Sequence, residues 1–178
     1  MTAQISETFF YKGEEYELVG MDGGDLISPL DFGMEPVALH TACWRGFYST
    51  YEITRDGIFL KEMTMREKNG NYKPVNNIMP ELADHEAHYK NLYVRVPFTG
   101  KLRLAKDFID ELYIHMGFQK PSAFETILDL TFEDGRLIDV KDRSKEMEKI
   151  RGEFKKRYEG KDIIEGIDEA FSLDMDLE

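Results

Sequence analysis

The sequence predicts an α+β protein: a curved antiparallel sheet or half-barrel of about eight strands, with packed helices and a helical C-terminal appendage. Three observations predict this fold. Glycine-containing turns recur between apolar segments, residue types alternate within those segments, and the C-terminal residues are rich in charges at helical spacing. A chain of 178 residues is long enough to bury such a core without disulfides.

Four pairs of apolar segments flank short turns that contain glycine, as the strands of β-hairpins do. Tight hairpin turns need positive φ, which glycine adopts at little cost. Hairpins also make neighbouring strands antiparallel. The predicted pairs are residues 9–11 with 15–19, 47–54 with 58–60, 92–98 with 101–104, and 124–132 with 136–140.

Alternation supports these strands. In residues 124–132, Phe124, Leu128 and Phe132 share one face, and mostly polar side chains occupy the other. In residues 92–98 the apolar side chains alternate in the same way. The sheet therefore has an aromatic face, which forms either a filled core or a cavity for one small ligand.

Helices are predicted between and after the hairpins. Residues 106–116 carry an apolar stripe at helical spacing, and residues 81–91 follow a proline suited to a first helical turn. Ser144 is suited to cap a helix that runs to about residue 158. A shorter helix is predicted at residues 161–171, and long loops are predicted at residues 20–36 and 68–79.

Two domains follow from this pattern. Residues 1–143 form a β-rich antiparallel domain with inserted helices, and residues 144–178 form a helical appendage whose charges are segregated. Bases outnumber acids in residues 145–161, whereas residues 162–178 carry acids and no base.

The net charge of −12 and the pI near 4.8 argue against nucleic-acid binding, which depends on cations that neutralise phosphates. No apolar run is long enough to cross a membrane, and the N-terminus lacks a secretory pattern. The single cysteine, Cys43, cannot form an intramolecular disulfide. We therefore expect a cytoplasmic protein that binds neither nucleic acid nor membrane.

The segment around Trp44 is the most distinctive part of the sequence. Trp44, Arg45 and Tyr48 are residue types enriched at binding hot spots, so they are our candidates for a recognition surface. An alternative function, a small-ligand carrier, would use a pocket inside the curved sheet. The candidates for its lining are Phe47, Tyr51, Val96, Phe98, Leu128 and Phe132.

We expect no metal and no cofactor. His85 and His88 would share one face of a helix with Glu81, but their spacing departs from the zinc-protease pattern. A third alternative, an enzyme of unidentified reaction, would need the histidines, including His40 and His115, to converge in a cleft.

Two short stretches, residues 41–46 (TACWRG) and 113–121 (YIHMGFQKP), resemble bacterial hypothetical proteins of a family without an assigned activity. This resemblance covers most of residues 7–144 and implies no function, cofactor or site residue.

The leading hypothesis is a non-enzymatic binding or regulatory protein that acts through a protein partner, as an inhibitor does. Its acidity would steer it toward a basic surface on that partner. The sequence leaves the oligomeric state open.

Overall fold

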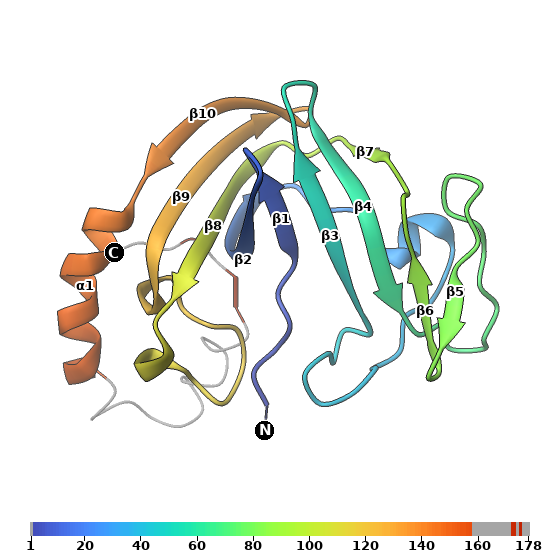
Figure 1. Cartoon of the computed structure of the whole chain (residues 1–178), viewed down its shortest axis with the longest axis horizontal. Coiled ribbons are helices and arrows are strands. Elements are labelled where there is room, and N and C mark those ends of the chain that lie inside the picture. The colour runs from blue at the N-terminus through green and yellow to red at the C-terminus, as the bar shows by residue number, and fades with distance from the viewer. Residues whose placement is uncertain (1, 158–171, 174, 176–178) are drawn as a thin grey trace.

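The computed structural model describes residues 2–157, 172–173 and 175, which form ten strands and one α-helix (Figure 1). The elements are, in chain order, β1 (Thr8–Tyr11), β2 (Glu14–Gly23), the 3-10 helix η1 (Pro29–Phe32), β3 (Phe47–Ile53), β4 (Ile58–Met65), β5 (Glu81–Ala83), β6 (Glu86–Tyr89), β7 (Val94–Val96), β8 (Gly100–Phe108), η2 (Asp110–Leu112), η3 (Pro121–Ala123), β9 (Phe124–Glu133), β10 (Arg136–Asp142) and α1 (Ser144–Arg157).

The strands form one sheet in the order β10-β9-β8-β2-β1-β3-β4-β6-β5, and β7 also pairs with β4. Every pair is antiparallel except β1–β3, whose strands run in the same direction. The sheet-rich α+β class and the antiparallel sheet are confirmed. The sheet is open, with β10 and β5 at its two ends, so the eight-stranded half-barrel is not confirmed.

Three of the four predicted hairpins are present as β1–β2, β3–β4 and β9–β10. The hairpin of residues 92–98 with 101–104 is wrong. Its first strand, β7, pairs with β4, whereas β8 pairs with β2 and β9. Gly100 begins β8 with φ +147°, and a Cβ there would overlap the Asp22 carbonyl oxygen. This glycine therefore permits close approach of two strands instead of forming a hairpin turn.

Two predicted helices are also wrong. In the range 81–91, residues 81–89 form the β5–β6 hairpin, because Asp84 and His85 both have positive φ, which suits a two-residue turn. In residues 106–116, β8 continues to Phe108 in register with β9, and only η2 is helical. The long β8–β9 ladder overrides the local apolar stripe. Phe108 packs against Phe124 from the end of β8, and Leu112 packs against the same buried cluster from η2.

One face of the sheet carries the main core, which includes Phe9, Leu18, Tyr51, Leu60 and Leu104. Two loops pack over this core. Partly buried apolar residues from the predicted loops 20–36 and 68–79 pack against it. Hydrogen bonds from tyrosine hydroxyls of the sheet hold the loops in place. The Tyr51 hydroxyl donates to the Ile27 carbonyl at 3.0 Å, and the Tyr89 hydroxyl donates to the Lys73 carbonyl at 2.8 Å.

Helix α1 covers part of the opposite face, at the β8–β10 end of the sheet (Figure 1). The helix predicted from Ser144 is thus confirmed, and its Met147 packs with Val19, Ala105 and Ile127 in a second core. The Arg151 guanidinium also donates to the carbonyls of residues 122 and 124. The helix predicted at residues 161–171 lies outside the described residues, and the two-domain division stays a prediction.

A charged network lies beside this second core. Arg103 donates to both carboxylate oxygens of Asp129, at 2.7 and 2.8 Å, and both side chains are buried. Arg143, just before α1, donates to the same carboxylate at 3.1 Å. The network links β8 and β9 to the start of the helix.

We predict that Asp129→Ala lowers the free energy of unfolding by about 3–5 kcal/mol, because it leaves the buried Arg103 without its carboxylate. The double variant Arg103→Met, Asp129→Leu removes both charges and should recover most of that loss. Urea unfolding of the two variants and the wild type measures the difference. A double variant as unstable as the single one would contradict this account of the network.

Candidate binding face

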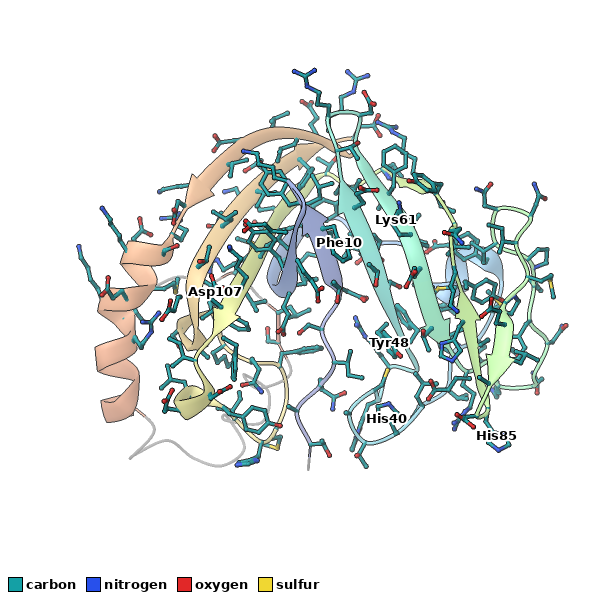
Figure 2. All side chains as sticks on the ribbon, viewed as in Figure 1. Phe10, His40, Tyr48, Lys61, His85 and Asp107 are labelled. Atoms are coloured by element: carbon teal, nitrogen blue, oxygen red, sulfur yellow. The ribbon has the colours of Figure 1, made fainter. Side chains whose placement is uncertain are left out.

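Helix α1 covers one part of the second face, and Met175 lies close to Gly20 near the end of β2. The part formed by residues 14–17 of β2 with β1, β3 and β4 carries exposed or half-buried side chains. We call this part the open face. Its residues alternate with core residues along each strand, as Phe10 does with Phe9 and Tyr11. Figure 2 labels Phe10 on β1, Tyr48 on β3 and Lys61 on β4, which belong to it.

Two rows of side chains cross the open face. In the first row, Thr8 pairs with Glu17 on one side and Thr50 on the other, and Thr50 pairs with Glu62. In the second row, Phe10 pairs with Glu15 and Glu52. Each row thus has a carboxylate on both sides of a neutral centre. Strands lie about 4.8 Å apart, so the Cα atoms of Glu15 and Glu52 are on the order of 10 Å apart.

The rows enclose an open depression of about 480 Å³. Its floor combines two hydroxyls with the Phe10 ring, which is 38% exposed. Three carboxylates and one ammonium group surround the floor, so the depression is acidic. The lining residues are Thr8, Phe10, Glu15, Thr50, Glu52, Lys61 and Glu62.

Lys61 is held between an acid and an aromatic ring. Its Nζ lies 2.9 Å from a Glu52 carboxylate oxygen and 3.8 Å from the centroid of the Tyr93 ring. Glu52, and then Tyr93, raise the pKa of Lys61, so the ammonium group stays charged. Tyr93 has φ +51°, which is uncommon for an aromatic residue, and its side chain is 58% exposed.

Of the other carboxylates, Glu62 interacts electrostatically with Lys90, which is itself paired with Glu81. Partial desolvation, followed by repulsion from Glu15, raises the pKa of Glu17 on the same strand. A cation placed over this side of the open face would favour the ionised form of Glu17.

The floor depends on the β1–β3 pair beneath it. Phe9 and Tyr51 are register partners, both fully buried, and their rings stack with centroids 4.8 Å apart. Just before β1, the Glu7 carboxylate accepts a hydrogen bond from the Ser49 N–H at 2.5 Å. The other oxygen of Glu7 lies 3.0 Å from Arg45 Nη2.

Glu7 is 3% exposed, whereas Arg45 reaches solvent in part. Burial raises the pKa of Glu7, and this effect outweighs the opposing influence of Arg45 and the Ser49 N–H. The Arg45 guanidinium carbon also lies 5.0 Å from the centroid of the Phe47 ring. Arg45 therefore connects the loop before β3 to the first residues of the sheet.

The structure places the predicted recognition residues in three environments. Trp44 is 63% exposed, Arg45 serves the buried Glu7, and Tyr48 is half-buried on β3. Tyr48 shares the side of β3 that carries Thr50 and Glu52, so it extends the open face toward the loop of residues 39–46.

The residues predicted to line a small-ligand pocket lie in the main core or pack against it. Phe98 meets Phe132 edge to face at 6.0 Å, and Tyr51 stacks on Phe9. Their mutual packing gives the small-ligand alternative no support. The set comprises Phe47, Tyr51, Val96, Phe98, Leu128 and Phe132.

The helix face predicted for Glu81, His85 and His88 does not exist, because these residues form the β5–β6 hairpin. Glu81 is paired with Lys90 at 2.7 Å, and His88 shares a hydrogen bond with Thr64 at 3.1 Å. Among the described residues, no group of three or more His, Cys, Asp or Glu side chains is placed to hold a metal ion.

The histidines named for the enzyme alternative occupy separate elements. His40 Nδ1 accepts from the Ala42 N–H in the loop before β3, and His115 meets the Tyr113 ring after η2. His85 lies in the turn between β5 and β6 (Figure 2). Among the described residues, these histidines therefore do not form one cluster, and the enzyme alternative gains no support from them.

Sequence reasoning missed most of the open face, namely Thr8, Phe10, Glu15, Thr50, Glu52, Lys61 and Glu62. The one available signal was alternation, which places polar residues opposite core residues in each strand. Alternation alone does not show which strands are neighbours.

No known protein family, curated protein or solved structure matches this chain. None of the helices in the described part of the chain has the length and apolar character needed to span a membrane.

We predict that Glu7→Gln changes how stability depends on pH. The pKa of Glu7 is higher in the folded protein than its ordinary value of 4.5, so the folded state binds this proton more readily. Wild-type stability contributed by Glu7 therefore decreases as pH rises from 4.5 through the folded pKa. The stability of Glu7→Gln relative to wild type should rise across that window and be constant outside it.

Urea unfolding at a series of pH values measures this difference. Glu7→Ala is the companion variant, because it also removes the acceptor of the Ser49 N–H and should cost about 3 kcal/mol. A constant difference between Glu7→Gln and wild type at all pH values would show that Glu7 is not perturbed by burial.

Proposed function

We propose that the protein is a cytoplasmic, non-enzymatic binding protein whose open face takes a basic segment of a partner protein, in the manner of an inhibitor. The single observation that carries this proposal is the acidic depression between β2 and β4, with carboxylates on both sides of a neutral floor.

A basic segment suits the charges of the open face. Glu15 and Glu17 lie on β2, and Glu52 and Glu62 lie on β3 and β4, so cationic side chains pointing to either side would meet a carboxylate. Glu52 is paired with Lys61, and Glu62 lies within electrostatic reach of Lys90, whose ammonium group is itself paired with Glu81. The net charge of −12 adds a long-range attraction for a basic partner.

The shape of the site favours a protein over a small molecule. Small-molecule sites bury most of the surface of their ligand, whereas this depression is broad and open. Aromatic residues extend it in two directions, with the half-buried Tyr48 toward the loop of residues 39–46 and the exposed Tyr93 beyond Lys61. Aromatic residues among charges are typical of protein-binding surfaces.

We predict that the open face binds a fluorescent oligolysine peptide and that the double variant Glu15→Gln, Glu62→Gln weakens this binding about fivefold. Both carboxylates are exposed and take no part in the core, so the variant should fold as the wild type does. Fluorescence anisotropy at low and at physiological salt measures the affinity, which should fall as salt rises.

The matched control is Glu125→Gln, Glu133→Gln, which removes the same charge from exposed positions on β9. This control should bind almost as the wild type does, since only the long-range attraction changes. Equal weakening in both double variants would show that net charge alone attracts the peptide and would reject the open face as the site.

A second prediction concerns the floor. Phe10→Ala should weaken binding of an oligoarginine peptide about threefold, because it removes an aromatic face on which a guanidinium can stack. Tyr113→Ala serves as the control, because it removes an exposed aromatic residue that does not line the depression. Equal affinities of Phe10→Ala and wild type would exclude Phe10 from the contact.

A further inference from the structure

The two end strands of the sheet differ in how they meet solvent. At one end, β5 has only three residues, and a short edge strand offers little for another strand to pair with. At the other end, β10 has seven residues and pairs on one side only, with β9. Within the described part of the chain, nothing pairs with its outer edge.

The side chains of β10 are unusually open for a strand that ends a large sheet. All of its residues except Leu137 are exposed, and two are apolar: Ile138 is 59% exposed and Val140 is 40% exposed. Exposed apolar side chains beside an unpaired edge are typical of a surface that another strand covers.

The charges of β10 are arranged so that two antiparallel copies of the strand place opposite charges beside each other. Asp139, Val140 and Lys141 form a triplet with opposite charges on either side of a small apolar residue. When two such triplets align antiparallel about Val140, each Asp139 faces the Lys141 of the other copy. The two Val140 side chains then face each other on the symmetry axis.

We propose that the outer edge of β10 pairs antiparallel with the β10 of a second copy of this chain, with Val140 on the two-fold axis. The pairing joins the two sheets and makes two identical Asp139–Lys141 ion pairs, as a two-fold interface requires. It uses the regular part of β10 that follows the bulge between Leu137 and Asp139.

The immediate surroundings leave both charged residues available. Lys141 Nζ has Glu146 of the same chain at 3.9 Å, which is a long ion pair between half-exposed side chains. A carboxylate directly opposite on a paired strand would lie closer than that. Helix α1 packs on β9 and η3 through Met147 and Arg151, and its Glu146 makes the long ion pair with Lys141.

The opposing interpretation is that the bulge and the charges of β10 protect an edge that must stay unpaired, as they do in many sheets. That interpretation predicts a monomer whose behaviour does not depend on which charge stands at which position. Self-pairing predicts a strong dependence on charge order, which separates the two.

The experiment is sedimentation velocity of the full chain over a range of concentrations. Wild type should show a reversible monomer–dimer equilibrium in the micromolar range, since a strand-edge interface is small. Asp139→Lys places lysine opposite Lys141, and Lys141→Asp places carboxylates opposite each other. Like charges directly opposite destabilise strand pairs, so each single variant should raise the dimer dissociation constant about tenfold or more.

The double variant Asp139→Lys, Lys141→Asp restores opposite charges at both positions and should recover the wild-type constant to within about threefold. The control Glu125→Lys makes the same charge change as Asp139→Lys on β9, away from the outer edge, and should leave the dimer intact. Circular dichroism confirms that each variant is folded.

A monomeric wild type at all concentrations would overturn the proposal. A dimer that survives both single variants, or that the charge swap fails to restore, would equally overturn it, because pairing would then use another surface. Val140→Lys gives an independent check, since it places two ammonium groups on the axis and should also separate the copies.

Discussion

The parallel pairing of β1 with β3 joins the two halves of the sheet, and the rest of the structure depends on it. On one side lie β2, β8, β9 and β10, and on the other lie β4, β6 and β5. In the described sheet, the ladder at this junction consists of the four residue pairs between β1 and β3. The pair is stabilised from the core side by the stacked rings of Phe9 and Tyr51 and from its beginning by the buried Glu7, which binds the Ser49 N–H. The same register sets Thr8 beside Thr50 and Phe10 beside Glu52, so the contacts that join the halves also build the open face.

How much of this could be predicted from the sequence depends on how local each interaction is. The β1–β2, β3–β4 and β9–β10 hairpins were predictable, because their turns lie within a few residues and carry glycine. The helix from Ser144 was predictable for the same reason. The conformation of residues 106–116 was not predictable. There β8 continues through Asp107, which has φ +62°, because Phe108 still pairs with Phe124 of β9. The β1–β3 pair was out of reach, since nothing local in either strand identifies a partner 42 residues away.

The candidate site shows the same limit. Tyr48 was singled out as part of a distinctive segment, and it does lie on the open face. Phe10, Glu15 and Glu62 were not, because they come together only once β2, β1, β3 and β4 are in order. Arg45 was expected at a recognition surface, yet it is engaged by a buried carboxylate, which no sequence pattern near Trp44 reveals. Residue type predicts what a side chain can do, whereas the order of the strands decides what it meets.

The residues at the boundary between the two parts of the second face indicate that the open face is suited to contact with water. Along β2, the residues on this face are Glu15, Glu17 and then Val19, and the change from acid to valine occurs where α1 begins to cover the sheet. Along β8 and β9, Ala105 and Ile127 meet Met147 of the helix, and the charges that share their face, Arg103 and Asp129, are paired and buried. Carboxylates on β2 could not be buried in this way without a cation for each of them. The open face therefore keeps its charges in contact with water, and a partner that covers it must bring positive charges of its own.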